Sequence, residues 1–127
     1  MQGLALTALP GRYAIGRLPA DAAFPAWLPT RGFVACTRTL HELSVVCEED
    51  ALPATVTATR GWRALGVDGP LAFELVGVLA SLSGALAAAA VSVFVVSTYD
   101  TDYLLVREAQ FEAAVAALRG AGHTVRV

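Results

Sequence analysis

The chain has 127 residues, of which 56% are hydrophobic and 16% are charged, and its formal net charge at pH 7 is −2. A chain of this length forms one compact unit or two small units, and its surplus of apolar residues favours burial against a second copy of itself. Arginine and acidic residues are scattered, with no basic stripe to displace counterions from phosphates, so the sequence argues against a nucleic-acid partner.

The first half of the chain has the pattern of short β-strands. Apolar segments alternate with turn residues, and no helical period is sustained before Thr55. A proline-rich connection at residues 19–29 allows at best a short helical turn around residues 24–28. The expected strands are residues 4–9, 12–18, 33–38 and 43–47, of which the last two would pair as a hairpin through residues 39–42.

The cysteines and the N-terminus both indicate a cytoplasmic protein. In the expected hairpin Cys36 would face Val45 and Cys47 would face Val34, so the two thiols would not oppose each other. We therefore expect two buried, reduced cysteines and no disulfide. The first nine residues lack the basic start, the apolar core and the cleavage site of a secretory signal.

The run from Leu75 to Tyr99 carries no charge, and its length is that of a membrane span. Residues 77–90 are mostly helix-forming Leu and Ala with Ser and Gly, whereas residues 91–96 are mostly β-branched and aromatic. We therefore expect a buried helix followed by a buried strand, each too short to cross a bilayer, and no membrane partner. The leucines at helical spacing, which are expected to form the apolar stripe, are Leu75, Leu79, Leu82 and Leu86.

The second half has a regular order of elements. A strand at residues 62–67 and a turn at 68–70 precede the helix, and strands at 91–97 and 103–106 follow it. Glu108 opens a second amphipathic helix that ends at Gly120 and Gly122, and residues 123–127 form a last strand. This strand-helix-strand-strand-helix-strand order predicts the α+β class and a ferredoxin-like βαββαβ sandwich.

That order, with a glycine at the head of the first helix, resembles the ACT domain, the small amino-acid-binding module of metabolic regulators. The family places a glycine at the helix start, small and apolar residues through the helix, and then a strand whose second residue is often polar. Gly77, the helix up to Ala90 and the strand Val91-Ser92-Val93 fit this spacing without a gap.

A narrower resemblance covers residues 91–108, where an apolar strand ends in Ser97-Thr98-Tyr99 and turns through Asp102 into the next strand. This segment is similar to one in the CASTOR family of cytosolic arginine sensors and in their short bacterial relatives. The N-terminal half of the chain also resembles these proteins, at residues 9–11, 33–37 and 42–46. The resemblance implies two ACT-like units. Residues 1–58 would be a degenerate, mostly β unit without a proper first helix, and residues 59–127 would be a complete ACT domain.

The resemblance also implies a ligand pocket where one ACT unit meets another, often across a homodimer. Free N–H groups at the helix start beside Gly77 suit an α-carboxylate, and Asp102, with Asp100 nearby, supplies the opposite charge for a cationic group. The alternative, purely structural explanations are that both aspartates flank a turn, where Asp is common, and that Gly77 only allows the helix to pack closely against a strand. The candidate ligand-binding residues are Gly77, Val78, Ser81, Thr98, Tyr99, Asp100 and Asp102.

The sequence departs from the arginine sensors at one position of the expected pocket. Their glutamate in the turn into this helix is matched here by Leu75, and Glu74 lies one residue earlier. Because one residue rotates a helical side chain by about 100°, Glu74 need not reach the pocket. The identity of the ligand therefore stays open.

Catalytic chemistry has little support in the sequence. His41 and His123 lack neighbours at metal-ligand spacing, no serine has an elbow motif, no phosphate-binding loop is present, and the chain contains no lysine. We therefore expect no enzyme activity, no metal and no cofactor. The leading hypothesis is a non-catalytic regulatory module that binds a free amino acid or similar ligand at an ACT-ACT interface. The alternative is a ligand-free interaction or scaffold domain of the same fold.

Overall fold

A computed structural model describes residues 3–72 and 74–127. It divides into two compact units. The two-helix unit consists of the chain up to Pro10 together with Arg63–Val127, and the β unit is Gly11–Trp62. This division differs from the expected units 1–58 and 59–127. The start of the chain belongs with the C-terminal residues because it forms a strand of their sheet.

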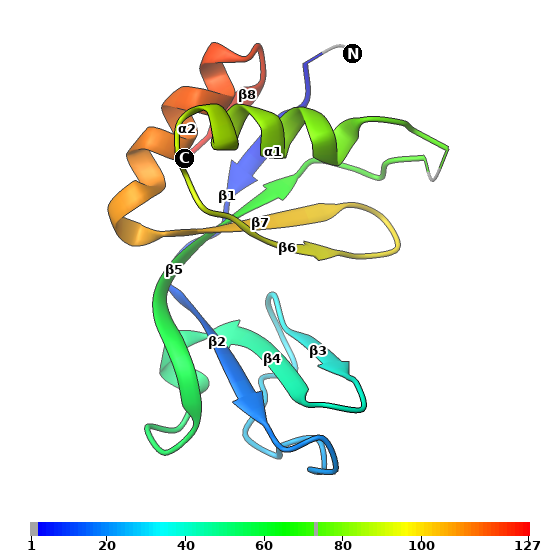
Figure 1. Cartoon of the computed structure of the whole chain (residues 1–127), viewed down its shortest axis with the longest axis vertical. Coiled ribbons are helices and arrows are strands. Elements are labelled where there is room, and N and C mark those ends of the chain that lie inside the picture. Colours follow the sequence, from blue (N-terminus) through cyan, green and yellow to red (C-terminus); the bar gives the residue numbers. More distant parts are fainter. Residues whose placement is uncertain (1–2, 73) are drawn as a thin grey trace. The chain divides into compact units, whose positions relative to one another are not determined.

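The two-helix unit has the expected α+β, ferredoxin-like fold. Its sheet has the strand order β6-β7-β5-β1-β8, in which β5 contributes its second half (Figure 1). The expected last strand does not adjoin β5, because β1 lies between the two, antiparallel to β5 and parallel to β8. The elements are β1 (Ala5–Ala8), β5 (Thr57–Val67), α1 (Val78–Ala88), β6 (Phe94–Ser97), β7 (Asp102–Arg107), the 3-10 turn Glu108–Gln110, α2 (Phe111–Gly120) and β8 (Thr124–Arg126).

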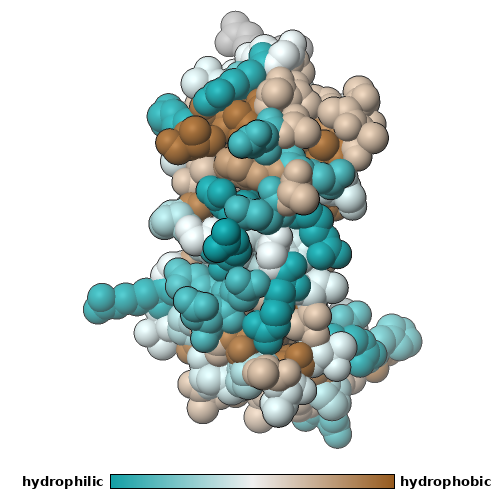
Figure 2. Space-filling model, turned by 90° about the vertical axis from the view of Figure 1, so that its left-hand side faces the viewer, coloured by the Kyte–Doolittle hydropathy of each residue, from teal (hydrophilic) through white to brown (hydrophobic). Residues whose placement is uncertain are grey.

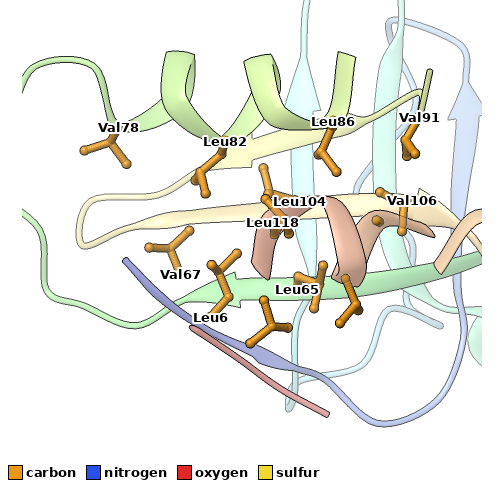
Figure 3. Packing of buried hydrophobic residues seen from close by; sticks show 13 residues of the cluster. Leu6, Leu65, Val67, Val78, Leu82, Leu86, Val91, Leu104, Val106 and Leu118 are labelled. Atoms are coloured by element: carbon orange, nitrogen blue, oxygen red, sulfur yellow. The ribbon is translucent and has the colours of Figure 1, made fainter. Parts of the chain in front are cut away.

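The core of this unit lies between its sheet and its two helices, which pack against each other. Helix α1 points Val78, Leu82 and Leu86 toward the sheet, where they meet residues of β1, β5 and β7 such as Leu6 and Leu104 (Figure 3). These side chains recur every four residues, so they share one helix face. Among the described residues, neither helix has both the length and the apolar composition to cross a membrane.

The expected leucine stripe of α1 was therefore wrong in part. Leu82 and Leu86 are buried, but Leu75 is 47% exposed and Leu79 is 39% exposed. Leu75 precedes the helix, which begins at Val78. Leu79 lies about 60° around the helix from the middle of the face formed by Val78, Leu82 and Leu86, so it stands at the edge of the buried face.

The β unit contains no α-helix in its described residues. Its strands are β2 (Tyr13–Leu18), β3 (Ala35–Arg38), β4 (Leu43–Glu48) and the first half of β5, in the order β3-β4-β2-β5. Buried residues such as Leu43 and Val45 form its core with Leu52, which follows the 3-10 turn Glu49–Ala51. The helical turn expected around residues 24–28 is a simple turn, closed by the hydrogen bond from Leu28 N to Pro25 O at 3.2 Å.

The hairpin of the β unit carries both cysteines, which are free thiols. Cys36 pairs with Val45 as expected. The expectation that both thiols are buried was wrong for Cys36, which is exposed because β3 lies at the edge of the sheet. Cys47 lies on the inner strand β4, where burial raises the pKa of its thiol and keeps it protonated at neutral pH.

Candidate functional site

The turn between β6 and β7 is held rigidly by its own hydrogen bonds. Thr98 N donates to Thr101 O at 2.7 Å, and the Thr98 hydroxyl donates to the same carbonyl at 3.0 Å while accepting from Thr101 N at 3.2 Å. Leu71 N donates to Asp100 O at 2.7 Å. This last bond ties the turn to the segment that leads into α1.

A small pocket lies where this turn meets the beginning of α1, and we call it the α1 pocket. Its volume is about 220 Å³. Apolar residues come from the segment before the helix and from its first position, and polar residues come from the ends of β6 and β7. The lining residues are Leu71, Ala72, Leu75, Val78, Ser97, Thr98, Tyr99, Asp100, Thr101 and Asp102.

Five of the seven predicted site residues meet in this pocket: Val78, Thr98, Tyr99, Asp100 and Asp102. Asp102 is half-buried and pairs with Ser97 across the β6–β7 ladder. Its Oδ1 accepts a hydrogen bond from the Ser97 hydroxyl at 2.6 Å, which fixes the carboxylate at the pocket wall. Asp100 is exposed at the mouth of the turn.

Gly77 lies at the head of α1 but does not itself line the pocket. It has φ +83°, a left-handed conformation that favours glycine, and its carbonyl accepts the N–H of Ser81 at 2.9 Å. No side chain caps this end of the helix, and no acidic residue lies in its first turn. Helix starts usually carry one or the other, because the first N–H groups lack partners within the helix.

Ser81 lies away from the pocket. Its hydroxyl is 3.2 Å from Nε2 of His123, which is buried. Nδ1 of His123 accepts the backbone N–H of Leu4 at 3.0 Å, so Nε2 carries the proton and donates to Ser81. This bridge joins α1 to the starts of β1 and β8, which explains Ser81 as a structural residue.

A second and larger pocket, which we call the sheet pocket, has a volume of about 610 Å³. It shares Thr98, Asp100 and Thr101 with the α1 pocket, but its other lining residues come from β1, β7 and the end of β5. No motif in the sequence pointed to it. The described residues contain no group of three or more His, Cys, Asp or Glu side chains that could hold a metal ion.

Comparison with protein families identifies the two-helix fold. The model of the ACT domain matches residues 57–120, and a second model, described as an N-terminal domain, matches residues 11–55. None of the curated proteins matches this chain.

Solved structures agree with the family match. Protein Atu0741 from Agobacterium tumefaciens is 41% identical, with a TM-score of 0.92 over 98% of this chain and 93% of that one. A Vibrio cholerae protein of unknown function, VC0802, described as a possible transport protein, is 20% identical, with a TM-score of 0.77 over 95% and 91%. The regulatory subunit of aspartate kinase from Thermus flavus shares the fold at 11% identity, with a TM-score of 0.64 over 95% and 99%. The chain described here belongs to the ACT domain family.

Proposed function

We propose that this protein is a non-catalytic regulatory module that binds a free amino acid, or a similar small molecule, in the α1 pocket. One observation carries the proposal: the pocket joins the half-buried carboxylate of Asp102 to the first residue of an uncapped helix. Membership of the ACT family and the shared fold of an aspartate kinase regulatory subunit support a regulatory role.

The charges around the pocket complement a zwitterion. The first turn of α1 offers free N–H groups and a partial positive charge, which attract a carboxylate. Asp102 and Asp100 belong to the polar part of the lining and attract an ammonium group. An α-amino acid carries both groups on one carbon atom, so a single small ligand can satisfy both sides of the pocket at once.

The size and the surroundings of the pocket favour a small ligand enclosed by a second unit. Its volume of 220 Å³ is below the range of about 300–1,000 Å³ that is usual for larger ligands. Tyr99, which lines the pocket, is 80% exposed, and Val76, which follows the lining residue Leu75 in the chain, is 87% exposed. Figure 2 shows further brown and tan side chains at the surface in the upper part of the view, where the two-helix unit lies. We propose that another ACT unit covers the apolar residues beside the pocket in a homodimer.

The resemblance to the CASTOR sensors belongs to the same proposal. It implies that Thr98, Tyr99 and Asp102 contact the ligand, and all three line the α1 pocket. Leu75, where those sensors have a glutamate, lines the pocket with an apolar side chain. We therefore propose that the ligand is an amino acid with an apolar or uncharged side chain. As the resemblance to cytosolic sensors implies, we also propose that the protein is cytoplasmic.

Thermal-shift screening against the twenty amino acids, followed by calorimetry, tests the proposal. At least one amino acid is expected to stabilise the protein, and Asp102→Asn should weaken its binding by about tenfold or more, because a charge-assisted hydrogen bond between the carboxylate and the ligand's ammonium group is lost. Asp50→Asn is the matched control, because Asp50 is exposed on the β unit. The Asp50→Asn protein should bind the amino acid as tightly as the unchanged protein does. The absence of any binder at millimolar concentration, or equal binding by Asp102→Asn, would contradict the proposal.

The second candidate function is a ligand-free interaction domain. The exposure of the apolar side chains of Val76, Leu79 and Tyr99 favours it, because exposed apolar residues suit contact with a protein partner, whether or not a ligand is bound. In that case Asp102→Asn would change neither thermal stability in the presence of amino acids nor the oligomeric state. Substitution of Val76 by aspartate would then abolish association without any ligand being involved.

A further inference from the structure

We propose that the sheet pocket is a second binding site, for a small organic cation with an apolar body, such as a primary amine without a carboxylate. It does not depend on the α1 pocket being occupied. Its volume of about 610 Å³ falls within the range of about 300–1,000 Å³ that is usual for small-molecule sites. The lining residues are Thr7, Leu9, Gly66, Val67, Asp68, Gly69, Pro70, Thr98, Asp100, Thr101 and Tyr103.

The apolar part of the pocket is built on a glycine. A Cβ placed on Gly66 would lie 3.0 Å from Cε2 of Tyr103 and 3.6 Å from Cδ1 of Leu9, so the aromatic ring lies against bare backbone. Any side chain at this position would push the ring away. Tyr103 and Leu9 therefore offer an aromatic face and an aliphatic wall to the body of a ligand.

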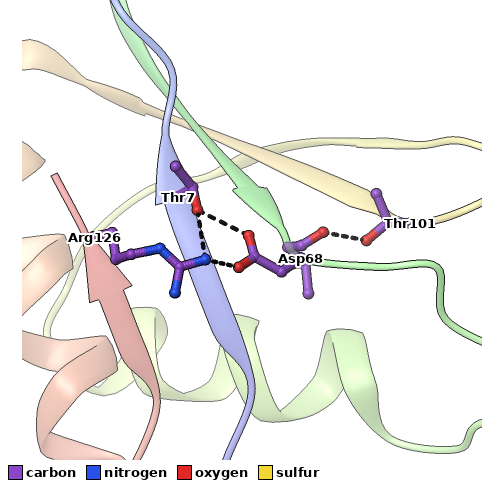
Figure 4. A network of polar contacts seen from close by, with 5 residues as sticks. Thr7, Asp68, Thr101 and Arg126 are labelled. Carbon is purple, nitrogen blue, oxygen red and sulfur yellow. Dashed lines mark hydrogen bonds and ion pairs between the residues drawn. The ribbon is translucent and has the colours of Figure 1, made fainter.

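The polar part is a carboxylate held in a fixed position. Oδ1 of Asp68 accepts the hydroxyl of Thr7 at 2.9 Å, and Oδ2 pairs with the guanidinium of Arg126, which also donates to the Thr7 hydroxyl at 3.2 Å (Figure 4). The Thr101 hydroxyl donates to the carbonyl of Val67 at 2.6 Å and so ties the β6–β7 turn to the end of β5. A carboxylate placed in advance of binding costs little reorganisation when a ligand arrives.

The carboxylate of Asp68 can accept further hydrogen bonds from a ligand. A carboxylate accepts about four hydrogen bonds, and two side chains engage the oxygens of Asp68. Its side chain is 35% exposed, so a ligand can reach it. Arg126 competes for the same charge from outside the pocket lining, with a side chain that is 60% exposed.

The charge balance selects a cation over an anion. The ionisable groups among the described lining residues that are charged at neutral pH are Asp68 and Asp100, both negative. An ammonium group would bind these carboxylates, and the face of Tyr103 adds an attraction for a cation within about 6 Å of the ring. A free α-carboxylate on the same ligand would be repelled, so an amine is preferred to the amino acid of the same shape.

Tyramine and tyrosine are the probes, because they share one body and differ by the carboxylate. Calorimetry is expected to show that tyramine binds more tightly than tyrosine at this site. Asp68→Asn and Tyr103→Leu should each weaken tyramine binding by about tenfold, whereas Asp102→Asn, which alters the α1 pocket alone, should leave it unchanged. Arg126→Gln should strengthen tyramine binding, since it frees the Asp68 charge.

Three outcomes would overturn the inference. They are no tyramine binding at millimolar concentration, loss of binding in Asp102→Asn in place of Asp68→Asn, and weaker binding in Arg126→Gln. Circular dichroism of each variant shows whether it is folded. If Asp68→Asn does not fold, Arg126→Gln still decides the question, because it leaves Asp68 intact. The amino-acid screen of the α1 pocket can fail or succeed independently of these results.

Discussion

Leu6→Asp is expected to unfold the two-helix unit. Leu6 is fully buried on β1, between β5 and β8, in the same core as Leu65 and Val125. Burying an unpaired carboxylate costs several kcal/mol, which is a large part of the roughly 5–15 kcal/mol that stabilises a domain. The helical circular-dichroism signal measures the loss, because α1 and α2 both belong to this unit.

Leu40→Asp is the control for this substitution. Leu40 is 93% exposed, so the same change of leucine to aspartate should leave the signal and the melting temperature nearly unchanged. A folded Leu6→Asp protein with an unaltered melting temperature would show that β1 is not part of the core, against the strand order described above.

Leu82→Ala is expected to lower the free energy of unfolding by about 2–5 kcal/mol, because it leaves a cavity between α1 and the sheet. Leu82 is fully buried, whereas Leu79 on the same helix is 39% exposed. Leu79→Ala should therefore lower the free energy of unfolding by less than about 1 kcal/mol. Urea unfolding followed by helical circular dichroism compares the two. Tryptophan fluorescence would report on the other unit, since Trp27 and Trp62 lie in Gly11–Trp62.

The pair also tests which face of α1 is buried. Equal losses for Leu79→Ala and Leu82→Ala would support the leucine stripe expected from the sequence. A larger loss for Leu82→Ala would support the face formed by Val78, Leu82 and Leu86.

The type and order of the elements could be predicted from local patterns. The change from Leu and Ala to β-branched residues near Val91 separated α1 from the following strand, and turn residues marked the other ends. The place of β1 could not be predicted in this way. Its pairing with β5 and β8 joins residues far apart in the chain, and a short apolar strand carries no signal for its partners.

The candidate site was predictable on one side. Asp102, Thr98 and Tyr99 follow a strand whose end and turn are local features, and all three line the α1 pocket. Leu71 and Ala72 were missed, because the hydrogen bond from Leu71 N to Asp100 O depends on tertiary packing. Ser81 was misplaced for the same reason: only the folded chain brings it to His123.

Mapping of backbone amide chemical shifts, with the amino acid that stabilises the protein most, tests the central claim most directly. The account predicts that the largest changes on titration fall on residues 71–80 and 97–102, at the start of α1 and the β6–β7 turn. Changes confined to the sheet-pocket residues Thr7, Leu9 and Gly66, or no saturable change at all, would contradict it.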